Sequence, residues 1–184
     1  SNIRVLGTIS SKGNRGETWI GIKYRQFPHG FGSGSLIVED NEYHELNEIT
    51  DKLLKEAQYS GFFALETKFC DKRKKTFIIE VNTRPVLWFG ATTSAKLFFV
   101  SQWCQSLGFL SITFKGRNQE KVNKPVVWKY FLKDLFISFK KTSKYSSKIL
   151  LPNQKINSFA VFDKYDLKPF IFDLCNGITK KMGF

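Results

Sequence analysis

The sequence predicts an α+β protein, an antiparallel sheet flanked by helices with a smaller helical appendage. Its 184 residues are 42% hydrophobic and only 24% charged, which is enough to bury a sizeable core. Strand-like and helix-like stretches alternate up to Gly108, whereas the chain after Ser111 is richer in lysine. We therefore expect one domain over residues 1–110 and a helical C-terminal extension over residues 111–184.

Two strands open the chain. Residues 3–10 and 18–27 are rich in β-formers, and the turn at 11–16 between them is rich in residues that tolerate positive φ. This pattern predicts a hairpin. Period-two alternation places Lys23 and Arg25 together on one face of its second strand.

Apolar residues at helical spacing predict the main helices. The first spans about residues 42–58 and the second about residues 93–107, each ending near a glycine. A third apolar stripe runs from Trp128 to Phe139, with Asp134 among the polar residues on its opposite side. We expect this stripe to dock on a core.

The chain's charge favours an anionic partner. Lysine and arginine outnumber acids 29 to 16, for a net charge of +13. The three cysteines, Cys70, Cys104 and Cys175, have no CxxC spacing, which argues against a zinc cluster or a disulfide scaffold and suits a reducing cytosol. No apolar run reaches the roughly 18–20 residues of a membrane span, and no signal sequence opens the chain, so we expect a cytoplasmic protein.

Two acids are predicted to face each other in a second hairpin. Residues 61–84 contain two runs of β-formers around the polar loop Asp71–Lys75. If the loop is symmetric about Arg73, Glu66 pairs with Glu80, and Asn82 lies two residues beyond Glu80. Lys68 projects from the same face as Glu66 by parity.

Opposed carboxylates repel unless a positive charge lies between them, and a divalent cation supplies it. Glu66, Glu80 and Asn82 present only oxygen ligands, which suits magnesium. Two alternatives stay open. The acids lie on a solvated face and pair with Lys68 and the cations of residues 72–75, or a loop of different length moves Glu80 to the other face.

The order of motifs resembles the C-terminal half of an ATP-grasp carboxylate–amine ligase over about residues 3–108. The motifs are residues 23–28, 30–35, 59–68 and 79–84, the last being Ile-Glu-Val-Asn-Thr-Arg, followed by Trp88. The resemblance implies the fold of that family's C-terminal subdomain for residues 1–110.

The resemblance also implies roles for individual residues. Glu66 and Glu80 match the two magnesium-binding acids, and Asn82 matches the amide at the second metal. Lys68 belongs with the ATP-binding residues. Three cations are the implied catalytic residues: Arg84 near the transferred phosphate, and Lys23 and Arg25 towards the triphosphate or a substrate carboxylate.

The implied reaction uses ATP and Mg²⁺ to convert a small-molecule carboxylate into an acyl phosphate, which an amine substrate then attacks. The resemblance places the adenine-contacting half before this chain. We therefore expect that half to come from the same enzyme or a partner chain, and the chain by itself to be inactive.

Two other functions stay open. One is a non-catalytic basic module that binds nucleic acid or an anionic membrane through the lysine-rich segment 140–148. The other is a degenerate ATP-grasp scaffold without turnover. We expect no sequence-specific nucleic acid partner, and the oligomeric state and the substrates are not predicted.

Overall fold

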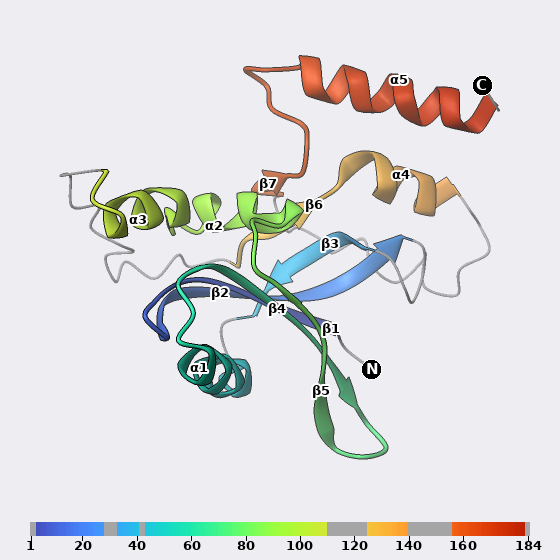
Figure 1. Cartoon of the computed structure of the whole chain (residues 1–184). Coiled ribbons are helices and arrows are strands. Elements are labelled where there is room, and N and C mark those ends of the chain that lie inside the picture. Colours follow the sequence, from blue (N-terminus) through green and yellow to red (C-terminus); the bar gives the residue numbers. More distant parts are fainter. Residues whose placement is uncertain (1–2, 28–32, 41–42, 110–124, 140–155, 183–184) are drawn as a thin grey trace.

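The computed structural model describes residues 3–27, 33–40, 43–109, 125–139 and 156–182. One seven-stranded sheet with the order β5-β4-β1-β2-β3-β6-β7 forms its centre, and helices flank it (Figure 1). The strands are β1 (Ile3–Ser11), β2 (Asn14–Phe27), β3 (Ser33–Glu39), β4 (Gly61–Cys70), β5 (Lys75–Asn82), β6 (Val127–Lys129) and β7 (Ser158–Phe159). The helices are α1 (Glu45–Ala57), the 3-10 helix η1 (Leu87–Phe89), α2 (Gly90–Ser94), α3 (Phe99–Ser106), α4 (Phe131–Phe139) and α5 (Lys168–Met182). The predicted α+β class is confirmed.

Neighbouring strands in the sheet are antiparallel, except that β7 runs parallel to β6. The predicted first hairpin is β1–β2, and β1 lies between β2 and β4. Strand β3 was not among the predicted strands, although its Leu36-Ile37-Val38 run is a strand signal. Strands β6 and β7 come from the stretch after residue 110 and extend this same sheet.

Helix α1 covers one face of the sheet. Its Leu46 and Leu54 are fully buried, and they pack with Leu6, Phe63 and Leu65 of the strands. The apolar face of α1 therefore forms a compact second core, as the helical spacing predicted.

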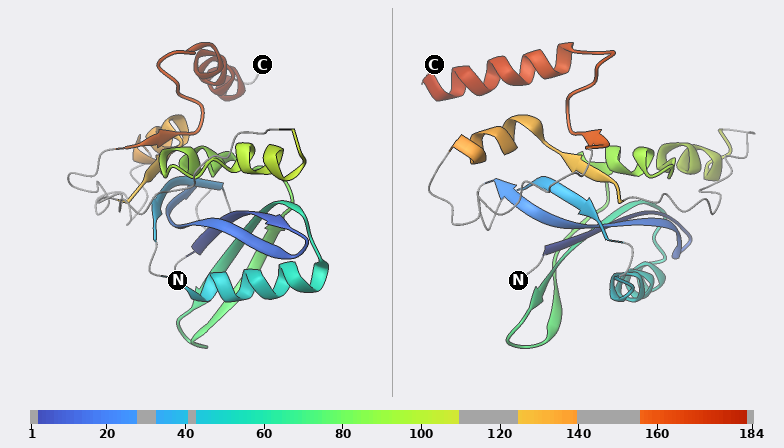
Figure 2. Two further views of the ribbon diagram at one scale, coloured as in Figure 1. Left: turned by 90° about the vertical axis from the view of Figure 1, so that its left-hand side faces the viewer. Right: turned by 180° about the vertical axis from the view of Figure 1, so that it is seen from behind.

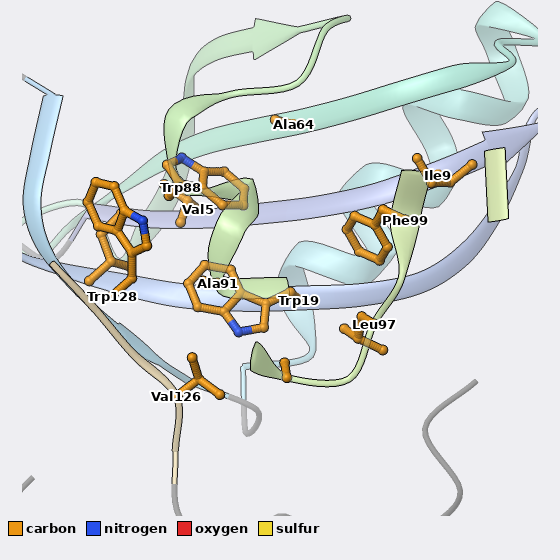
Figure 3. Close-up of a cluster of buried hydrophobic side chains, with 12 residues drawn as sticks. Val5, Ile9, Trp19, Ala64, Trp88, Ala91, Leu97, Phe99, Val126 and Trp128 are labelled. Carbon is orange, nitrogen blue, oxygen red and sulfur yellow. The ribbon is translucent and has the colours of Figure 1, made fainter. Parts of the chain in front are cut away.

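The larger core lies on the other face, under η1, α2 and α3 (Figure 3). The Trp19 and Trp88 rings lie with their centroids 5.4 Å apart. Glycines make room for both rings, because a Cβ at Gly7 would lie 2.9 Å from the Trp88 ring and one at Gly21 would lie 2.8 Å from the Trp19 ring. The cluster's buried members are Val5, Ile9, Trp19, Ile37, Ala64, Trp88, Ala91, Ala95, Leu97, Phe99, Val126 and Trp128.

The predicted single helix over residues 93–107 is wrong. Helix α2 ends at Ser94, Lys96 takes a left-handed φ of 61°, and α3 begins only at Phe99. The Leu97 amide donates to the Thr92 carbonyl at 2.8 Å, which closes off α2. This break buries both Leu97 and Phe99 in the larger core, and a continuous helix would give up that packing.

The start of the third predicted stripe is also wrong. Trp128 lies in β6 and is buried in the larger core, whereas α4 begins at Phe131. In the part of the chain that the structure describes, no helix is both long enough and apolar enough to cross a membrane.

Candidate functional site

The β4–β5 hairpin places Glu66 directly opposite Glu80 and Ala64 opposite Asn82, which confirms the predicted pairing. The route to this register differs from the expected one. Cys70 pairs with Lys75, so the loop has four residues rather than a symmetric turn about Arg73. An irregularity between Glu66 and Thr67 then restores the pairing, because Thr67 faces Ile78 and leaves Ile79 as an extra residue.

The two acids therefore lie on one face of the sheet. Ala64 belongs to the larger core, and alternation along β4 puts Glu66 and Lys68 on the same face as Ala64. Glu66 keeps 17% of its side chain exposed, and Glu80 is exposed. The acid pair thus lies next to Ala64, at the edge of the larger core.

Lys23 supplies a positive charge to this acid pair. Its Nζ lies 2.5 Å from Glu66 Oε2, and its side chain is only 5% exposed. The register explains the contact, because Ile3 of β1 pairs with Lys23 on one side and with Lys68 on the other, and Glu66 lies two residues from Lys68 along β4. The partner of Glu66 is thus Lys23 rather than the cations of residues 68–75, and the packing of the acids does not by itself require a metal.

Arg25 is engaged elsewhere. A register shift separates it from Lys23, and its Nε lies 2.7 Å from Asp134 Oδ1 while its Nη2 donates to Asp134 Oδ2 at 2.9 Å. Lys129 Nζ lies 2.8 Å from the same Oδ2. The Asp134 side chain is only 2% exposed, so a buried carboxylate fixes α4 to β2 and β6.

The burial of Asp134 was not predicted from the sequence. Helical spacing placed it on the polar side of the stripe, which ordinarily faces water. Here that side turns towards Arg25 and Lys129, whose side chains are 13% and 21% exposed. Contacts between distant segments of this kind cannot be predicted from the pattern of one helix.

Arg84 lies two residues beyond β5 and is exposed, and its Nη1 donates to the Pro85 carbonyl at 3.3 Å. Asn82 is half-buried on the face that carries Glu80. The structure thus brings together Lys23, Glu66, Glu80 and Asn82, and it leaves Arg84 in solvent on the connection to η1.

A second polar cluster joins Tyr130, just before α4, to α5, and Lys133 of α4 to β3. The Tyr130 hydroxyl donates to Asp173 at 2.9 Å. The pKa of Tyr130 is raised to about 12, mainly because the hydroxyl is buried and secondly because of this hydrogen bond. Lys133 donates to Ser33 Oγ at 2.8 Å, and burial lowers the pKa of its ammonium. These contacts hold α4 and α5 in place.

Within the described ranges, no three histidine, cysteine or acidic side chains gather into a metal cluster. The candidate site consists instead of two carboxylates, one amide and one ammonium. That set can bind a hard cation through oxygen or a phosphate through Lys23.

No family model matches the sequence, and no curated protein matches it. Solved structures that match include an L-amino acid ligase from Bacillus licheniformis, at 17% sequence identity and a TM-score of 0.39. The match covers 53% of this chain and 25% of that one, so the chain spans about a quarter of that ligase's length. At this identity and TM-score the likeness does not assign the chain to a family.

Proposed function

We propose that this chain forms the metal- and phosphate-binding part of an ATP- and Mg²⁺-dependent ligase that joins a carboxylate to an amine through an acyl phosphate. The observation that supports it most is the direct pairing of Glu66 with Glu80 on one face, with Asn82 two residues further on. The order of the sequence motifs around these residues is similar to that of ATP-grasp ligases.

The residues present fit a magnesium ion. Mg²⁺ takes one or two carboxylates from the protein and completes its shell with water and phosphate oxygens. Glu66 contacts Lys23 through Oε2, and a carboxylate has a second oxygen to offer a cation. Glu80 and the Asn82 amide would complete the protein's share of the ligands.

The chain's own residues would mainly position and neutralise. Lys23 holds Glu66 in place and carries charge towards a bound phosphate, with Lys68 further along the same face. Arg84, exposed beside the acids' strand, would meet charge that develops on the transferred phosphoryl group. Bound Mg·ATP supplies the phosphoryl group that activates the carboxylate.

Arg25 has a different place in this proposal. Its two contacts with Asp134 make it an anchor for α4 rather than a binding group for the triphosphate or a substrate carboxylate. We propose that the adenine-binding half is supplied by an upstream segment of the same cytoplasmic enzyme or by a partner chain.

The test measures Mg·ATP binding by calorimetry, and phosphate release with an amino-acid mixture as carboxylate and amine, on the natural full-length protein. The Glu66→Gln, Glu80→Gln double variant should lose both. A matched control replaces the exposed Glu48 and Glu56 of α1 by glutamine and should keep both.

Unchanged nucleotide binding in the double site variant would contradict the metal assignment. Metal-dependent nucleotide binding without phosphate release would favour a degenerate scaffold instead. The lysine-rich segment 140–148, on which the basic-module alternative depends, lies outside the described residues.

A further inference from the structure

The tip of the β4–β5 hairpin projects away from the body of the molecule (Figures 1 and 2). Beside it lies an open hollow of about 530 Å³. Its lining includes Lys68, Phe69, Lys72, Arg73, Phe77 and Ile79. The hollow thus combines aromatic and aliphatic walls with three cations and one acid, Asp71, which also lines it.

The charge at this tip is strongly one-sided. Residues 71–75 carry four cations and one acid, Asp71, and all five side chains are exposed. Lys68, opposite Phe77 in the ladder, adds a fifth cation. Exposed cations in a turn are ordinarily only solvated, so the charge needs a second feature to indicate a ligand.

Phe77 supplies that second feature. Its side chain is 42% exposed, although it lines the hollow, and the Arg73 guanidinium carbon lies 5.9 Å from its ring centroid. An exposed ring bordered by cations suits a ligand that has both a flat aromatic group and phosphates. A lipid surface is a poorer match, because the ring faces a concave hollow instead of standing out from the tip.

We propose that the β4–β5 hairpin tip binds single-stranded nucleic acid without sequence preference. Phosphates lie against Lys72, Arg73 and Lys75, and a base stacks on Phe77. The site does not depend on the acid pair or on a ligase reaction, so its failure leaves the proposed function standing.

The test is fluorescence anisotropy of the full chain with labelled oligo(dT) and oligo(rU) over a series of salt concentrations. The site variant replaces Lys72, Arg73 and Lys75 by glutamine. It leaves Lys74 unchanged, because that residue has a φ of 49° and belongs to the turn's conformation. The control variant replaces three exposed lysines elsewhere, Lys52, Lys55 and Lys164, so the two variants have the same net charge.

We expect the site variant to reduce the slope of log affinity against log salt by about 2, since each lost phosphate contact on a single strand contributes roughly 0.7. The control should keep the original slope. Phe77→Leu, which removes the ring and keeps an apolar side chain, should weaken binding at least about fivefold at any salt. Circular dichroism confirms that each variant is folded, and Phe77→Leu alone decides if the triple variant is not.

Three results would overturn the proposal. The first is no oligonucleotide binding at low salt. The second is equal loss in the site and control variants, which would reflect overall charge alone. The third is hairpin-dependent binding to vesicles containing phosphatidylserine with no hairpin-dependent binding to oligonucleotides, which would assign the tip to lipid.

Discussion

Asp134→Asn should be among the most destabilising single changes of a polar residue in this chain. Asparagine keeps the shape of the side chain and removes its charge. Arg25 and Lys129, which are 13% and 21% exposed, would then be left in a poorly hydrated region without their carboxylate. Breaking a buried ion pair by removing one partner costs about 3–5 kcal/mol.

The matched control is Asp51→Asn. Arg15 holds Asp51 with the same two-pronged geometry, at 2.6 and 3.1 Å, but the Asp51 side chain is 51% exposed. An exposed pair of this kind contributes at most about 1 kcal/mol. The two variants thus differ in burial, and Asp134 has a second cation partner in Lys129.

Urea unfolding followed by tryptophan fluorescence measures both, because Trp19 and Trp128 are buried and report loss of the core. In thermal unfolding, the midpoint temperature of the Asp134 variant should be roughly 6–20 °C lower, because a chain of this size loses about 2–4 °C per kcal/mol. The cost of Asp51→Asn should shrink further with added salt. If Asp134→Asn costs no more than Asp51→Asn, the assignment of Asp134 as the buried anchor of α4 is wrong.

Three further outcomes are expected. Gly21→Ala should cost about 1–3 kcal/mol in urea unfolding, since its Cβ would lie 2.7 Å from Ile37 Cγ2; Gly90→Ala, whose nearest neighbour would be 3.5 Å away, is the neutral control. Tyr130 has a pKa of about 12 in the folded protein against an ordinary 10.0, so its contribution to stability is present below pH 10 and is lost as pH rises through 12. In a spectrophotometric titration of the folded protein, Tyr130→Phe should remove one tyrosine that ionises late, and an unchanged titration would refute the assignment. Lys23→Met should tighten binding of free Mn²⁺ a few-fold, because it removes the ammonium that competes with the metal ion for Glu66, and should weaken binding of Mg·ATP, because it removes a partner for phosphate. Equal effects on both ligands would contradict this role of Lys23.

The sequence allowed the α+β class, the first hairpin and the helix now labelled α1 to be predicted, because each follows from local periodicity. The Glu66–Glu80 pairing was also predicted, but from a symmetric loop that the structure does not have. A four-residue loop and an extra residue at Ile79 cancel each other in register. The alternation of side chains along a strand cannot distinguish a symmetric loop from a four-residue loop with an extra residue in β5.

What could not be predicted depends on contacts between distant segments. Lys23 meets Glu66 only because β1 lies between β2 and β4, an order that no single strand pattern contains. The burial of Asp134 likewise depends on where α4 docks. The break at Lys96 gives up helical hydrogen bonds for tertiary packing, which outweighs local propensity.

The most direct test of whether Glu66 and Glu80 form a metal site is a Mn²⁺ titration of this chain followed by electron paramagnetic resonance, since Mn²⁺ shares the preference of Mg²⁺ for oxygen ligands. We predict one bound ion, with affinity reduced at least about tenfold by Glu66→Gln and again by Glu80→Gln, as expected when ligand charge is removed. Binding that both substitutions leave unchanged, or no binding at all, would mean that Lys23 alone neutralises these acids and that the pair is not a metal site.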